Sequence, residues 1–220
     1  MRYIQKKEEP KSLTEYRKNR NAYFDGFSEK DDIREALLEE QGYLCGYCMR
    51  RIKDKKETKI EHIVPQSILK EDERKALDFK IMLGVCYGNC KKGRGAEALT
   101  CDAHRGNKDL NVNPFEKRCI EAIKYNSEGK IYSEDANVMD SVDKVLNLNY
   151  DGPDTYLMRN RAAVLQACKN KLLKLQKQGI WNKKILQQML TYYESPNAEG
   201  ELIPYSGIAI WYLKKKLGKL

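Results

Sequence analysis

Four cysteines placed around a short acid–histidine–proline segment constrain this chain more than any other feature. They are Cys45, Cys48, Cys86 and Cys101, and the segment Glu61–Pro65 lies between the second and third of them. A Cys-x2-Cys turn supplies two thiolates from one tight loop, and two further cysteines complete a tetrahedral zinc site. The spacing therefore predicts a structural zinc site. Cys90 stands only four residues after Cys86, so the sequence leaves open which of these two is the ligand.

The composition favours an anionic partner and excludes a membrane span. The chain has 220 residues, and its 41 Lys+Arg against 32 Asp+Glu give a formal charge of +9. A modest basic excess favours nucleic acid as the partner. No run of about 20 apolar residues occurs, and the first residues lack the apolar core of a signal peptide. Seven cysteines, an odd number, without an export signal indicate metal binding rather than disulfides and a cytoplasmic location.

The residue pattern divides the chain into three parts and predicts an α+β fold. We expect an N-terminal arm over 1–30, a zinc-clamped core over 31–115 and a basic, all-helical region over 116–220. The last region is expected to consist of five helices, at 116–126, 136–148, 154–178, 181–194 and 204–217. Lysines crowd the last three of these helices.

Short elements are expected inside the core. A helix is predicted over 31–41, where apolar residues have helical spacing and Gly42 follows. Residues 50–52 and 59–64 are short enough to be strands, and Pro65 ends the second one. Further helices are expected at 68–77 and, directly after the last clamp cysteine, at 102–110.

The Glu61-His62 pair has the composition of a hydrolytic site. An imidazole with a pKa near neutrality can take a proton from water. A carboxylate can hold a divalent cation beside a scissile phosphate. Adjacent residues on a strand point to opposite faces, so the two side chains have different roles. The zinc clamp around them favours a catalytic site over an ordinary core histidine.

These residues resemble the HNH endonuclease family, whose core is a zinc-bound ββα-metal fold. The resemblance rests on Cys-x2-Cys, the segment Glu61–Pro65, Cys86 and Cys101-Asp102-x-x-Arg105-Gly106-Asn107. It is more specific toward the PtuB-type HNH subunits of Septu-type and some retron-associated antiphage systems. The additional cues are the opening Met-Arg-x-Ile, Met82–Cys86 and Asn111-x-Asn113-Pro114. The similarity is strong over about 1–115 and only architectural beyond.

The resemblance implies a role for each matching residue. His62 would be the general base, and Glu61 and Asp102 would bind Mg²⁺ or Mn²⁺. Arg105 would contact phosphate, and Asn107 is assigned with it to nucleic-acid binding. His104 is either a further metal ligand or an exposed helix residue.

This chain departs from the family pattern at one position. Ile81 stands where the family has its central asparagine, which normally helps to orient the histidine. Asn89 and Asn107 are the candidates to take over that role.

The resemblance also implies partners. They are a PtuA-like ABC/SMC-type ATPase, nucleic acid and, in a retron setting, a complex of reverse transcriptase with its msDNA. No Walker A motif occurs in the chain, so any ATP dependence comes from the partner. The sequence thus favours a metal-dependent nuclease that acts in antiphage defence, on DNA or on RNA such as tRNA.

Two other functions remain open. The first is a non-catalytic, zinc-clamped adaptor that binds nucleic acid or the ATPase, and Ile81 is the main residue in its favour. The second, which the spacing fits poorly, is a sequence-specific regulator built on a zinc finger.

Overall fold

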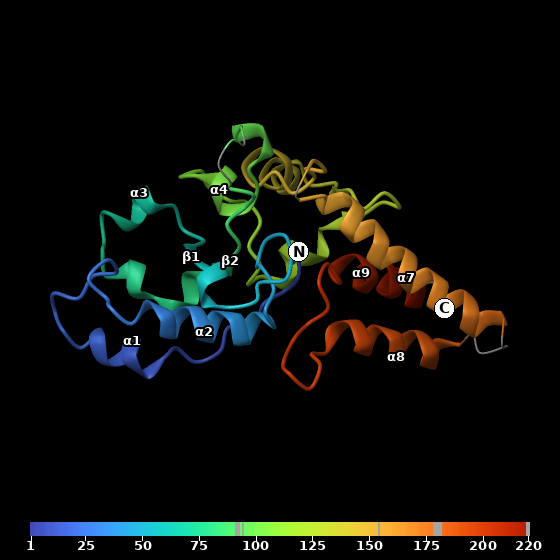
Figure 1. Ribbon diagram of the computed structural model, residues 1–220, viewed down its shortest axis with the longest axis horizontal. Helices are drawn as coiled ribbons and strands as arrows, with labels where there is room; N and C mark the ends of the chain where they lie inside the picture. Colours follow the sequence, from blue (N-terminus) through green and yellow to red (C-terminus); the bar gives the residue numbers. More distant parts are fainter. Residues whose placement is uncertain (91–92, 94, 154, 178–181, 219–220) are drawn as a thin grey trace.

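A computed structural model describes residues 1–90, 93, 95–153, 155–177 and 182–218 of the chain (Figure 1). The fold is mixed α/β, with 46% helix and small antiparallel sheets, in agreement with the predicted class. No helix in the described ranges is long and apolar enough to cross a membrane. The division into three parts stays a prediction.

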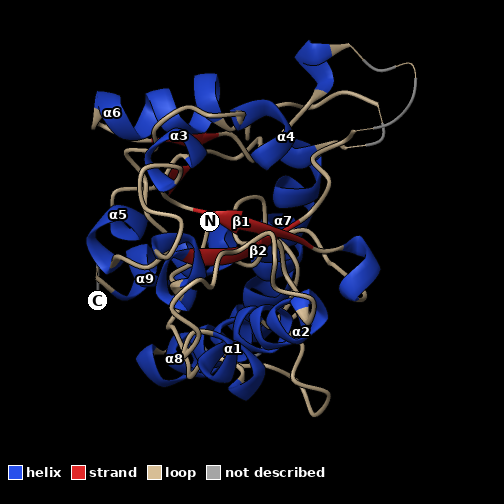
Figure 2. Cartoon of the chain, turned by 90° about the vertical axis from the view of Figure 1, so that its left-hand side faces the viewer, coloured by secondary structure: helices blue, strands red, loops and turns tan. Residues whose placement is uncertain are grey.

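A two-stranded antiparallel sheet forms the centre of the N-terminal half. Strand β1 (Lys59–His62) pairs with β2 (Met82–Val85), and Glu61 lies opposite Leu83. The prediction of a strand at 50–52 was wrong, because Arg51 makes only one isolated bridge, to Leu44, which closes the Cys-x2-Cys turn. In Figure 2 the sheet lies between α2 and α4.

Helix α2 (Lys30–Gln41) covers one face of this sheet, close to its predicted bounds. Ile33, Leu37 and Leu38 are buried on its inner face, and Gly42 ends it in the left-handed conformation. Gln41 then fastens the helix end to the sheet. Its amide group donates to the Gly84 carbonyl at 2.7 Å and accepts from the Gly84 N–H at 2.7 Å.

The other helices of this half are shorter than expected. Helix α1 (Lys11–Tyr16) lies in the N-terminal arm, and α4 (Cys101–Arg105) starts at the last clamp cysteine. The helix expected at 68–77 is two separate pieces, α3 (Gln66–Leu69) and a 3₁₀ turn at Lys75–Leu77. The backbone of residues 70–74 between them forms turns, and the Arg74 side chain donates to three carbonyl oxygens of the N-terminal arm.

The region after 115 is not all-helical, which corrects the prediction. Strands β3 (Lys124–Tyr125) and β4 (Ile131–Tyr132) form a small hairpin where the end of a helix was expected. Gly129 permits this turn, because it has a φ of +83° and any Cβ there would lie 2.0 Å from the Met158 carbonyl oxygen. Tyr125 and Ile131 pack into the core from the hairpin.

Helices make up the rest of this region. They are α5 (Lys117–Glu121), α6 (Ala136–Met139) with a π-helical continuation at Asp140–Val145, α7 (Leu157–Lys177), α8 (Lys183–Glu194) and α9 (Gly207–Leu217). Positions 154, 178 and 181, at the predicted helix ends, lie outside the described residues. Helices α7, α8 and α9 gather on one side of the molecule, opposite α1 and α3 (Figure 1).

One buried cluster joins the two halves of the chain. It contains Met1 and Ile4 from the arm, Val85 from β2, Leu157 from α7 and Ile208 from α9, together with the four clamp cysteines. A second cluster lies under α7, α8 and α9. The cysteine cluster is therefore supported by helices that come more than 50 residues later in the sequence.

Candidate functional site

The four predicted clamp cysteines converge in the interior. Their sulfur atoms lie within 4.8 Å of one another, and all four side chains are buried. The Sγ–Sγ distances are 3.9 Å for Cys45–Cys101, 3.8 Å for Cys48–Cys86 and 3.9 Å for Cys86–Cys101. This cluster could hold a metal ion such as zinc. Cys90 is exposed, so Cys86 is the member of the cluster.

Tight local packing builds the cluster from loops and element ends. The Met49 N–H donates to the Cys45 carbonyl at 2.9 Å and closes the first turn. Gly46 is required in this turn, because a Cβ there would lie 2.5 Å from the Leu83 side chain. Cys86 directly follows β2, and Cys101 opens α4. The cluster therefore fixes α4 relative to the sheet.

Arg50 places a positive charge close to the cluster. Burial works against the charge of Arg50, but the thiols of Cys48 and Cys86 raise its pKa above the usual value. Burial likewise opposes ionisation of Cys48, and hydrogen bonds from the other cysteines lower its pKa well below the usual value. Four thiolates around Zn²⁺ would leave a net negative charge, which the Arg50 guanidinium would partly compensate.

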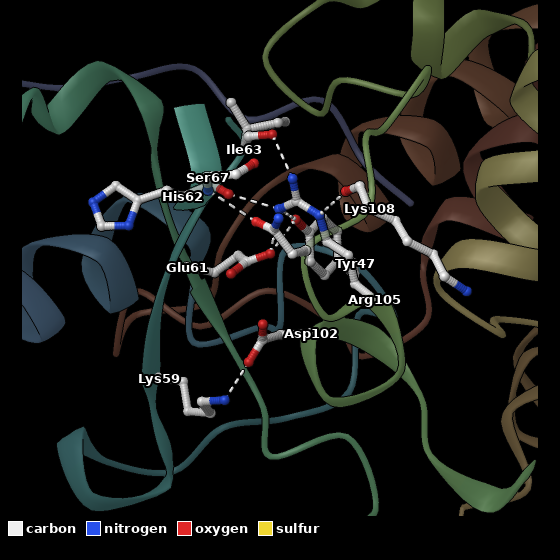
Figure 3. Close-up of polar contacts among 10 residues, drawn as sticks. Tyr47, Lys59, Glu61, His62, Ile63, Ser67, Asp102, Arg105 and Lys108 are labelled. Carbon is white, nitrogen blue, oxygen red and sulfur yellow. Dashed lines mark hydrogen bonds and ion pairs between the residues drawn. The ribbon is translucent and has the colours of Figure 1, made fainter. Parts of the chain in front are cut away.

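Glu61 lies at the centre of a buried ion-pair network on the α4 side of β1 (Figure 3). Its Oε1 accepts from Arg105 Nη1 at 2.5 Å and from the Tyr47 hydroxyl at 3.0 Å. Arg105 also donates to the carbonyl oxygens of His62 at 2.6 Å and Ile63 at 2.8 Å. This guanidinium is buried and positions Glu61 and the end of β1, and its contact with phosphate stays a prediction.

Asp102 provides a second carboxylate beside Glu61. It lies in the first turn of α4 and pairs with Lys59 of β1. Burial, and next the negative charge of Asp102, raise the pKa of Glu61 to about 7, although Arg105 acts in the opposite direction. A buried carboxylate beside a second negative charge is a place where added positive charge is stabilising.

His62 points to the opposite face of β1 from Glu61, as strand alternation requires (Figure 3). Its Nε2 lies 2.8 Å from the Ala76 carbonyl oxygen, and Phe24 packs edge-on against the ring with centroids 4.8 Å apart. A carbonyl only accepts hydrogen bonds, so Nε2 carries the proton and Nδ1 is free to accept one. Burial lowers the pKa of His62, which favours the neutral ring.

Side chains from both faces of β1 line a single cleft. It has a volume of about 360 Å³ and runs past the end of β1 between the arm, α3 and α4. Glu61, His62 and Asp102 all line it, and Tyr23 and Phe24 of the arm form its far wall. The arrangement can hold a proton-accepting imidazole and two cation-binding carboxylates around one small ligand.

Three residues considered from the sequence have other contacts. His104 is half-buried, and its Nδ1 lies 3.0 Å from the Val145 carbonyl oxygen. Asn107 accepts through its side-chain oxygen from the Ser67 N–H at 3.0 Å. Asn89 is buried and donates to the Ala98 carbonyl at 2.9 Å. Neither asparagine touches His62 in these contacts, and the carbonyl of Ala76 orients the ring instead.

Sequence reasoning missed four participants in the site. Tyr47, Lys59, Phe24 and Ala76 each contact one of the predicted residues. Lys59 stands two positions before Glu61, so the period of a strand places both on one face and could have indicated it. The Ala76 carbonyl and Phe24 carry no such signal, because backbone oxygens and distant loop residues are placed only by folding.

Searches with this sequence against protein-family models and against curated proteins find no match.

Proposed function

We propose that this protein is a metal-dependent nuclease of the HNH kind that cleaves phosphodiester bonds. The observation that carries the proposal is the shared cleft of Glu61, His62 and Asp102, formed by two antiparallel strands and the helix that starts at a clamp cysteine. A strand pair followed by a helix that starts at the cysteine cluster supports the resemblance to a ββα-metal core.

His62 is the proposed general base. The Ala76 carbonyl holds the proton on Nε2 and leaves Nδ1 to accept one from water or from a ribose hydroxyl. Burial lowers its pKa, so the ring is neutral at physiological pH. This backbone contact replaces the orienting asparagine, for which Ile81 stands in this chain.

Glu61 and Asp102 are the proposed ligands of a catalytic cation. Their oxygen donors suit Mg²⁺ or Mn²⁺. Burial and, next to it, the negative charge of Asp102 raise the pKa of Glu61, and a divalent cation between the two groups would offset both effects. A bound cation would stabilise the negative charge that develops on the scissile phosphate. Lys59 and Arg105 hold the two carboxylates in place from either side.

We further propose that the nuclease acts in antiphage defence with a PtuA-like ATPase, and with a reverse transcriptase–msDNA complex in a retron setting. This part rests on the sequence resemblance. Both DNA and RNA fit a site that recognises the phosphate backbone, and recognition of this kind carries little sequence information.

A non-catalytic adaptor is the second candidate, and one observation favours it. Both carboxylates already have cationic partners, Arg105 for Glu61 and Lys59 for Asp102. A network that is complete without a metal ion would stabilise the fold and have no catalytic role.

Cleavage assays separate these two functions. Labelled duplex DNA, single-stranded DNA and tRNA are incubated with zinc-loaded protein and Mg²⁺ or Mn²⁺, with and without the ATPase. We expect cleavage by the wild type and its loss in His62→Ala and in Asp102→Asn. His104→Ala is the matched control and should retain activity. Equal inactivity of the wild type and His62→Ala on every substrate, with folding verified, would establish the adaptor.

A further inference from the structure

A small pocket on the C-terminal side of the molecule has the chemistry of a nucleotide site. It has a volume of about 260 Å³ and lies between the β3–β4 hairpin, α7 and α9. Its walls include the rings of Tyr125, Trp211 and Tyr212 and the side chains of Lys169 and Lys215, with no acidic residue. Pockets for small ligands have volumes of about 300–1,000 Å³. This pocket lies just below that range, so it suits a group no larger than a nucleotide.

Lys169 and Lys215 of this pocket lie over aromatic rings. Lys215 Nζ lies 5.2 Å from the ring centroid of Trp211, and Lys169 Nζ lies 5.7 Å from that of Tyr212. Across the described part of the chain, no carboxylate forms an ion pair with either lysine. Lysines held over aromatic rings place positive charge beside flat apolar surfaces, the combination that single-stranded nucleic acids bind through stacking and phosphate contacts.

A larger hollow continues this surface. It has a volume of about 1,040 Å³ and shares Tyr125, Trp211 and Lys215 with the small pocket. Together the two hollows are lined by seven basic and three acidic side chains. Two of the acidic side chains, Glu134 and Glu194, are ion-paired with lysines of the same wall. The surface therefore suits an extended anion rather than a single small one.

We propose that this surface binds a single-stranded segment of nucleic acid, with one nucleotide seated in the small pocket against Trp211 and Tyr212. The site is separate from the cleft at β1, since α7 and α9 lie on the other side of the molecule from α3 (Figure 1). It depends on the proposed function only in taking nucleic acid as the partner. It would hold a substrate strand while the cleft acts on another part of it.

Binding is tested in the zinc-loaded His62→Ala protein, which separates binding from cleavage. Fluorescence anisotropy is measured with labelled dT and U oligonucleotides of about 12 residues, long enough to span the stacking and phosphate contacts of such a surface. We expect Lys169→Glu/Lys215→Glu to weaken binding at least about tenfold and to reduce the salt dependence, because two phosphate contacts are lost. Lys183→Glu/Lys184→Glu on α8 is the control of equal charge and should change affinity less than about twofold.

A second readout does not depend on these variants. Trp181→Phe leaves Trp211 as the only tryptophan of the chain. Bound oligonucleotide should quench its fluorescence, and a free mononucleotide should do so only weakly. Equal loss of affinity in both lysine pairs, or an unchanged Trp211 signal at saturation, would overturn the proposal. An acidic peptide can be tested as a competitor. If it binds this surface and displaces no oligonucleotide at any concentration, the oligonucleotide binds elsewhere and the proposal is wrong. Failure of the nuclease proposal alone would appear as absent cleavage with this binding intact.

Discussion

Ala76 makes the two ring nitrogens of His62 inequivalent, because its carbonyl oxygen lies 2.8 Å from Nε2. The only other histidine of the chain, His104, has the opposite arrangement, with Nδ1 facing the Val145 carbonyl oxygen at 3.0 Å. A carbonyl accepts and cannot donate. The fold therefore orients the two rings differently, and of the two histidines only His62 keeps Nδ1 as an acceptor.

These tautomers can be observed directly. In ¹⁵N-labelled protein near neutral pH, long-range ¹H–¹⁵N spectra should show His62 protonated at Nε2 and His104 protonated at Nδ1. His104→Gln removes one set of signals and assigns the other. The same tautomer at both positions would contradict these two hydrogen bonds and remove the proposed proton acceptor.

The Cys86 thiol should be required for metal binding and the Cys90 thiol should not. Cys86 is buried in the four-sulfur cluster, whereas Cys90 is exposed. We expect Cys86→Ser to lose a zinc ion that the wild type holds at about one per chain, and to unfold at a much lower temperature, because structural zinc sites contribute folding energy directly. Cys90→Ser should match the wild type. Elemental analysis measures the zinc content of each variant, and thermal unfolding measures its stability. Loss of zinc in Cys90→Ser but not in Cys86→Ser would show that Cys90 is the ligand instead of Cys86.

Replacing Arg105 should be strongly destabilising. Its guanidinium is buried and donates to Glu61 and to the carbonyls of His62 and Ile63. Arg105→Leu leaves two backbone acceptors unpaired and leaves the buried Glu61 carboxylate with the Tyr47 hydroxyl but no cationic partner, which should cost about 3–5 kcal/mol of unfolding free energy. Arg118→Leu is the control, since that arginine pairs with Glu116 on the surface and its loss should change stability little. Urea unfolding gives the unfolding free energy of both variants. Equal losses in Arg105→Leu and Arg118→Leu would show that the buried network stabilises the fold no more than a surface ion pair does.

Glu61 should make the stability of the protein fall as pH rises toward neutrality. Its folded-state pKa is raised from 4.5 to about 7, mainly by burial. Between these values the folded protein holds a proton that the unfolded chain has lost, so this contribution is full at low pH and disappears as pH passes 7. From about pH 5.5 to 7 the loss should reach about 2 kcal/mol relative to Glu61→Gln, which cannot titrate.

The measurement compares urea unfolding of zinc-loaded wild type and Glu61→Gln across this range, without other divalent cations. If the unfolding free energies of the two proteins change in parallel with pH, the pKa of Glu61 is not raised by folding. Added Mn²⁺ should flatten the wild-type curve and leave that of Glu61→Gln unchanged, because the proposed ligand set needs the ionised carboxylate.

Local sequence was sufficient to predict most of the cysteine cluster and the elements with strong patterns. Cys45, Cys48 and Cys101 followed from spacing, and the helix at 31–41 from its apolar period and the glycine that ends it. The hairpin at 124–132 was missed, because strands of two residues carry no period and their pairing depends on packing against α7 and α9.

The sequence by itself determined which residue types are available for chemistry: a neutral-range histidine, two carboxylates and four clamp thiols in a fixed order. Tertiary structure alone decided how they are used. Pairing of β1 with β2 placed Cys86 in the cluster and left Cys90 outside it. Folding also brought the Ala76 carbonyl to His62 and buried Arg105 against Glu61. These contacts join segments that are many residues apart, and their free energy exists only once the core that holds them has formed.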